Sequence, residues 1–127
     1  MRKILLTALT LMTALATMAD SFKTSGDGTT WTMTRLAQTK GTGVTCDGLT
    51  FTMTSDVEIA EGDAFAIESG ITVMMGGGVR LTVSGLADFR ATERVLFTAA
   101  DELEQPYGIF MCNTERTTFQ NIDFEYA

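Results

Sequence analysis

The sequence predicts an all-β domain whose short parallel strands stack as the coils of a solenoid. Short apolar–polar alternations recur between Gly-containing turns, and Thr is abundant, which is typical of many short strands. No long helical pattern is visible. The alternation is clearest from Phe51 onward, where alternate side chains would point to one buried face. The same order of strands also recurs at a longer interval, and that recurrence favours a solenoid.

Three apolar strand positions recur in step about two dozen residues later in the chain. The pairs are Ile59 with Leu81 and Ile67 with Phe89 at about 22 residues, and Ile71 with Val95 and Val73 with Phe97 at about 24. In a coil of three short strands, each strand stacks on its counterpart one turn later. We therefore expect the members of each pair to lie over one another, in about three coils. An antiparallel β-sandwich is the alternative, because it also has short alternating strands and tight turns.

Residues 1–19 have the layout of a secretory signal peptide. Arg2 and Lys3 precede an apolar stretch over residues 4–15, and small residues follow up to Ala19, where we expect cleavage, with Ala16 as the alternative. The apolar stretch is shorter than the roughly 20 residues of a membrane-spanning helix. We therefore expect a protein that is secreted or held on the outer cell surface, with no transmembrane segment after signal cleavage.

Residues 20–50 are expected to form a flexible start and an N-terminal cap. Residues 21–28 are polar and Gly-rich, which indicates flexibility. Residues 30–38 could begin as a strand and finish as a short helix. The β-coils would then occupy residues 51–127, with a tight corner at residues 76–78 and an inserted loop at residues 101–106.

Charge and composition restrict the partners. The chain has a formal net charge of −7 and no His, and removal of the two basic residues in 1–19 makes the mature chain more acidic. Nucleic acid is therefore not expected as a partner, because phosphate binding needs a basic face. Cys46 and Cys112 could pair after export, but their spacing predicts nothing about distance, so buried thiols are the default and pairing stays open.

Residues 61–63, 65–73 and 78–85, followed by 91–99, 107–109 and 119–124, carry a resemblance to a known family. They resemble the opening coils of secreted bacterial right-handed parallel β-helix proteins of the pectate-lyase-like superfamily. The resemblance covers about residues 51–127 and concerns fold more than activity. In that family an N-terminal segment commonly covers the exposed end of the β-helix, which implies this role for residues 31–38.

The resemblance also implies a chemistry to look for. Polysaccharide lyases of this superfamily use a basic side chain to abstract a proton beside a uronate carboxylate, with acidic residues holding calcium. Side chains of suitable type on outward positions are Arg80, Arg90, Arg94, Glu68 and Asp88. No family catalytic motif matches at these positions, and outward charges usually form a solvated face. We therefore assign no catalytic residue.

Metal, cofactor and stacking sites are not assigned either. Asp101, Glu102 and Glu104 form an acidic loop without the spacing of a calcium loop such as the EF-hand, so a solvated loop is expected. Trp31, Tyr107 and Tyr126 could stack on sugar rings if exposed, but each lies in an apolar pattern that favours packing.

The expected function is that of a secreted or cell-surface scaffold and binding module, non-enzymatic in this chain, with carbohydrate or a cell-surface component as the candidate partner. The alternative is the N-terminal part of a polysaccharide lyase or other carbohydrate-active enzyme, whose catalytic coils lie outside this chain. The sequence ends inside an apolar alternating run with no polar terminal coil behind it. We therefore expect an incomplete C-terminal end that takes further coils or self-associates.

Overall fold

The computed structural model describes residues 21–101, 105–112 and 117–127, so the expected signal peptide lies outside the described residues. The described chain is mostly strand, which confirms the all-β prediction. Its elements are β1 (Ser21–Lys23), β2 (Thr30–Trp31), α2 (Met33–Gln38), β3 (Val44–Asp47), β4 (Thr50–Met53), β5 (Asp56–Ile59), β6 (Ala64–Ala66), β7 (Thr72–Met75), β8 (Arg80–Val83), β9 (Leu86–Ala99), β10 (Gly108–Met111) and β11 (Phe119–Phe124). Across these described ranges, no helix combines the length and hydropathy of a membrane span.

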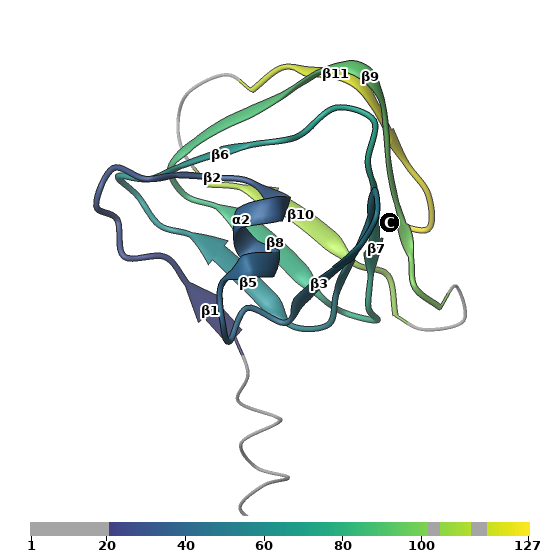
Figure 1. Cartoon of the computed structure of the whole chain (residues 1–127), viewed down its shortest axis with the longest axis horizontal. Coiled ribbons are helices and arrows are strands. Elements are labelled where there is room, and N and C mark those ends of the chain that lie inside the picture. Colours follow the sequence, from purple (N-terminus) through teal and green to yellow (C-terminus); the bar gives the residue numbers. More distant parts are fainter. Residues whose placement is uncertain (1–20, 102–104, 113–116) are drawn as a thin grey trace, which may run out of the picture.

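The strands form two parallel-dominated sheets that surround one interior (Figure 1). One sheet has the order β1-β5-β8-β10, and the other has the order β2-β6-β9-β7-β4-β3, with β11 added beside β9. The long strand β9 bends, so that its first residues pair with β6 and its last residues pair with β7. Among the pairs formed by described strands, only β3 with β4 is antiparallel. The predicted parallel pairing is therefore confirmed, whereas a sandwich would need antiparallel neighbours.

The strand register confirms most of the predicted stacking and corrects one part of it. Val73 lies opposite Phe97, and the pairing of Thr72 with Leu96 places Ile71 and Val95 at the same offset. Ile59 was predicted to lie opposite Leu81, but it lies opposite Val83. The reason is the length of the corners. Residues 60–63 separate β5 from β6, whereas only residues 84–85 separate β8 from β9. Because of this two-residue difference, paired residues are 24 positions apart between β5 and β8 but 22 apart between β6 and β9.

The interior is filled by apolar side chains from all the strands and from α2. Phe65 and Phe89 pack with ring centroids 5.5 Å apart, in successive strands of one sheet. The fully buried large side chains are Phe65, Phe89, Phe97, Met33, Leu36, Met53, Ile59, Met75, Leu81, Val57, Val73 and Val83. Figure 1 shows α2 lying across the end of the strand stack that faces the viewer. Residues 30–38 therefore form the predicted strand followed by a short helix, and Met33 and Leu36 anchor that helix in the core.

The segment expected to be a flexible start is instead part of the fold. Its first residues form β1, which pairs in parallel with β5. The following turn is closed by backbone hydrogen bonds, since the Thr24 N–H donates to the Glu58 carbonyl at 3.0 Å and the Ala64 N–H donates to the Thr29 carbonyl at 3.0 Å. Polar and Gly-rich composition suggested flexibility, but here the glycines allow a tight turn whose polar backbone is satisfied by neighbouring strands.

The two cysteines are exposed and unpaired, so the expectation of buried thiols is wrong. Cys46 lies on β3, a strand in which Val44 alone is buried. Cys112 directly follows β10, and its backbone N–H donates to the Val83 carbonyl at 2.9 Å. The corner predicted at residues 76–78 is present, with Gly78 at a φ of +71° and its N–H donating to the Gln105 carbonyl at 3.1 Å.

Replacing Tyr107 with phenylalanine is expected to lower the free energy of unfolding by about 1 kcal/mol. Tyr107 is 4% exposed, and its hydroxyl donates to the Phe97 carbonyl at 2.9 Å, which ties the segment before β10 to β9. Urea denaturation followed by circular dichroism measures the change. Tyr126→Phe is the control, because Tyr126 is 55% exposed and water can replace a contact that its hydroxyl makes. An equal loss in both variants would contradict the structural role of the Tyr107 hydroxyl.

Candidate functional site

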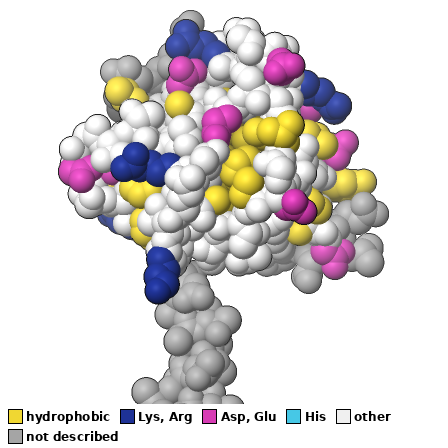
Figure 2. Space-filling view, in the orientation of Figure 1, with side chains coloured by type: hydrophobic (Ala, Val, Ile, Leu, Met, Phe, Trp, Pro, Cys, Tyr) yellow, Lys and Arg dark blue, Asp and Glu magenta, His cyan; other side chains and the backbone are white. Residues whose placement is uncertain are grey.

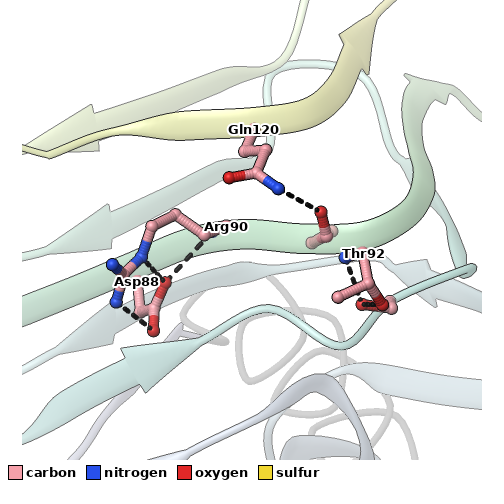
Figure 3. Close-up of polar contacts among 6 residues, drawn as sticks. Asp88, Arg90, Thr92 and Gln120 are labelled. Atoms are coloured by element: carbon pink, nitrogen blue, oxygen red, sulfur yellow. Dashed lines mark hydrogen bonds and ion pairs between the residues drawn. The ribbon is translucent and has the colours of Figure 1, made fainter.

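The charged residues that the sequence singled out lie on the surface, and the side chains of all but Arg80 contact neighbouring residues. Arg90 and Asp88 form a two-point ion pair, with Nε 3.1 Å from Oδ1 and Nη2 3.3 Å from Oδ2 (Figure 3). The hydrogen bond from Arg90 lowers the pKa of Asp88, and the same pair raises the pKa of Arg90. An arginine held charged in this way is a poor general base.

The other candidates are engaged elsewhere. Arg94 pairs with Asp123 on β11, and the Glu68 carboxylate accepts hydrogen bonds from the backbone N–H and hydroxyl of Thr34 at the start of α2. The Arg80 backbone N–H donates to the Asp56 carboxylate at 2.9 Å. Apart from Arg90 and Asp88, which contact each other, no two of the candidates share a contact. The contacts of Arg80 and Arg94 join neighbouring strands, and that of Glu68 joins the corner after β6 to α2, which is a structural role.

The bend of β9 is held by a further set of polar contacts (Figure 3). The Thr92 N–H and hydroxyl lie 2.9 and 3.1 Å from the Ser69 hydroxyl oxygen. The side-chain amides of Gln120 and Asn121 donate to the Ala91 carbonyl at 3.2 and 2.7 Å. Three successive passes of the chain are therefore fastened at one corner.

Asp63 is the most unusual carboxylate of the described chain, and its sequence context, after Gly62, indicates only a turn. It is 2% exposed and accepts hydrogen bonds from the backbone N–H groups of Gly26, Gly28 and Thr29 at 2.8, 2.9 and 2.9 Å. Its pKa is lowered to about 2, first by the hydroxyl of Thr24 and then by these N–H donors, against the opposing effect of burial. Asp63 therefore fixes the turn that leads into β2 and α2.

Three glycines stack at the same corner and leave no room for side chains. A Cβ on Gly62 would lie 2.8 Å from the Gly26 carbonyl oxygen, and a Cβ on Gly85 would lie 1.9 Å from the Asp63 carbonyl oxygen. Gly62 and Gly85 lie in turns expected from the sequence, whereas Gly26 lies in the segment expected to be flexible, and no sequence signal shows that the three touch one another. The signal that could have located Asp63 is an Asp that follows a turn glycine directly before a strand.

A groove of about 540 Å³ runs beside this corner. Its walls and floor are formed by Gly28, Thr30, Glu61, Gly62, Asp63, Ala64, Ser84, Gly85, Leu86 and Cys112. Leu86 is 55% exposed and supplies an apolar contact, while Thr30 and Ser84 supply hydroxyl groups. The described lining contains no Lys or Arg, so the groove suits a neutral, hydroxyl-bearing ligand better than an anion.

The second exposed feature is the edge formed by β11. Phe119 and Phe124 are each 43% exposed, and their rings lie 4.9 Å from Phe89 and 5.4 Å from Phe97. They therefore continue the buried aromatic columns to the surface. Among the three aromatic residues expected to pack, Tyr107 is buried and Trp31 packs against Phe22, but Tyr126 is exposed, so that expectation is wrong for Tyr126.

The surface carries mixed charge. On the face in Figure 2, Lys and Arg side chains lie apart from one another among Asp and Glu. Among the described residues, no group of three or more Cys, Asp or Glu side chains could hold a metal ion; the acidic loop lies mostly outside the described residues, since Glu102 and Glu104 are not among them. No family model matches this chain, and no curated protein or solved structure matches it.

Proposed function

We propose that this chain is a secreted or cell-surface module that folds as a right-handed parallel β-helix and serves as a scaffold for binding, without catalysis of its own. The proposal is supported by four parallel strand pairs at offsets of 22 or 24 residues, β4 with β7, β5 with β8, β6 with β9 and β7 with β9. Stacking of this kind builds a continuous core from strands that could not bury it alone.

The observation that carries the proposal is the difference between the two ends of the sheets. In the larger sheet, β3 forms one edge and packs beside α2, whose Met33 and Leu36 are fully buried. The opposite edge is β11, where Phe119 and Phe124 are exposed. A module closed at one end and open at the other is suited to carry further β-structure or a partner.

The corner groove is the proposed contact site for carbohydrate or another cell-surface component. Its hydroxyl groups and the exposed Leu86 suit a neutral sugar, which presents both hydroxyl groups and apolar ring faces. The lyase alternative would require a free base next to a uronate. The pairing of Arg90 and Arg94 with carboxylates does not favour it.

Two measurements test the proposal together. The mature chain is incubated with pectin, alginate and chondroitin, with and without calcium, while the absorbance of unsaturated products is followed, and its binding is measured on an array of neutral and acidic glycans. We expect no turnover and retention on neutral glycans. Leu86→Asp in the groove should reduce retention at least about tenfold, which is 1.4 kcal/mol of binding free energy.

The matched control for this substitution is Leu49→Asp, because Leu49 is 68% exposed and does not line the groove. Turnover of any of the three polymers by the chain would refute the non-enzymatic proposal. Equal retention of the Leu86→Asp and wild-type proteins would refute the groove as the contact site.

A further inference from the structure

We propose that β11 is a docking edge for a second copy of this chain, and that two copies pair through it about a two-fold axis. The inference rests on the proposed β-helix and names the partner of its open end. The end-to-end contact would add a strand to the sheet that β9 and β11 already form.

The edge is apolar because it continues the interior of the molecule. Phe89 packs at 5.5 Å from Phe65 on one side and at 4.9 Å from Phe119 on the other, so Phe119 is the next member of a buried column. Phe97 and Phe124 repeat the arrangement with nearly stacked rings, 21° apart. Side chains that would be interior in a longer stack are therefore half exposed here.

The backbone of the edge is also available. β11 pairs in parallel with β9 along one side, and none of the described strands lies along its other side. Long edges of this kind are usually blunted by Lys, Pro or a covering element. Within residues 119–124 there is neither Lys nor Pro, and the polar groups of Gln120 and Asn121 are directed to the Ala91 carbonyl.

The covered opposite end determines the symmetry. A head-to-tail contact would bring β11 of one copy against β3 of the next, where α2 packs, and repeated contacts of that type would make a filament. A two-fold contact uses β11 of both copies and closes after two. An axis passing between Asn121 and Ile122 pairs the strands antiparallel and places Phe119 of one copy beside Phe124 of the other.

The charges on the edge permit this pairing. Asp123 is neutralised by Arg94 within its own copy, and the Glu125 carboxylate accepts a hydrogen bond from the Thr98 hydroxyl at 3.1 Å. In the antiparallel register, Asp123 faces Gln120 of the partner copy. No two carboxylates of β11 therefore oppose each other directly, which would have been destabilising.

The size of the edge sets the expected affinity. Phe119 and Phe124 are somewhat less than half exposed, and at about 200 Å² for a fully exposed aromatic side chain they offer about 170 Å² per copy. With Ile122 and the strand backbone added, the contact stays near or below the roughly 1,200 Å² at the lower end of standard interfaces. We therefore expect a weak dimer, with a dissociation constant on the order of 10 µM.

Sedimentation velocity of the mature chain, from about 1 to 300 µM, tests the inference across this range. We expect a monomer–dimer equilibrium in the wild-type protein, and at least about tenfold weaker association in Phe119→Lys and in Phe124→Lys. Leu49→Lys is the matched control, because Leu49 is exposed in the turn between β3 and β4 at the other edge of the sheet. Circular dichroism establishes that each variant is folded. Should both Phe variants unfold, Gln120→Glu on the same strand provides the test, because its carboxylate would face Asp123 of the partner copy and weaken association.

A wild-type protein that stays monomeric at the highest concentration overturns the inference and leaves the edge to another partner. Open-ended polymers would contradict the proposed two-fold symmetry of the dimer. A dimer weakened only by Leu49→Lys would contradict the proposed location of the contact at β11. The proposed function fails in a different way, since turnover or loss of glycan retention would appear in assays at concentrations where the chain is monomeric.

Discussion

Substitution of Gly85 by alanine is expected to remove most of the stability of the domain, a loss of at least about 4 kcal/mol in the free energy of unfolding. A Cβ at this position would lie 1.9 Å from the Asp63 carbonyl oxygen, 2.8 Å from the Ala60 carbonyl oxygen and 2.9 Å from the Asp63 carbonyl carbon. All three are backbone atoms of the preceding corner, so they cannot rotate away as a side chain would. Relief requires the two corners to separate, which breaks the hydrogen bond from the Leu86 N–H to the Asp63 carbonyl at 3.1 Å.

The control for this prediction is Gly41→Ala. Gly41 has a φ of +88°, which disfavours alanine, but no atom lies within 4 Å of the position that a Cβ would take there. Its cost should be only about 1 to 2 kcal/mol, from backbone strain. Thermal and urea unfolding of both variants separate the two causes. If Gly85→Ala loses no more stability than Gly41→Ala, the close corner stacking is wrong.

Asp63→Asn is expected to lower Tm by about 10 °C or more. Asn keeps one acceptor oxygen but places an NH₂ group where the second oxygen receives a hydrogen bond, so a donor would face the N–H of either Gly26 or Gly28. Asp63 is 2% exposed, and water therefore has little access to replace the lost contact. The turn before β2 and α2 should loosen first, which hydrogen exchange of the Gly26, Gly28 and Thr29 amides would report.

The same carboxylate predicts an acid-dependent stability. Its pKa in the folded protein is about 2, below its usual value of 3.8, because the Thr24 hydroxyl and three backbone N–H groups favour the charged form. The unfolded chain therefore takes up the proton first as the pH falls. Stability from Asp63 is complete above about pH 4 and is lost as the pH falls toward 2.

Asp27→Asn is the matched control for both measurements, because Asp27 lies in the same turn but is exposed and contacts the Thr29 hydroxyl. Tm should fall between pH 4 and pH 2 more steeply in the wild-type and Asp27→Asn proteins than in Asp63→Asn. Parallel pH profiles for all three proteins would show that Asp63 is not held in its charged form by the fold.

The sequence predicted the fold to the extent that alternation and repetition determine it. Val73 over Phe97 followed from both. The strand and short helix before Gly41 followed instead from the placement of apolar residues within 30–38. The offset at Ile59 was wrong because two corners differ in length, and a repeat read from apolar positions averages over such differences. Asp63 could be recognised only as an Asp in a turn, because the backbone N–H groups that it binds lie more than thirty residues away and have no sequence signature.

The bent strand β9 joins what would otherwise be separate faces. It runs without interruption from Leu86 to Ala99 and is hydrogen-bonded to β6, β7 and β11. A force applied to any of these three strands is therefore transmitted through a single covalent segment to the other two. We therefore expect the two parts of the sheet on either side of the β9 bend to resist mechanical load together, so that neither part shears independently of the other.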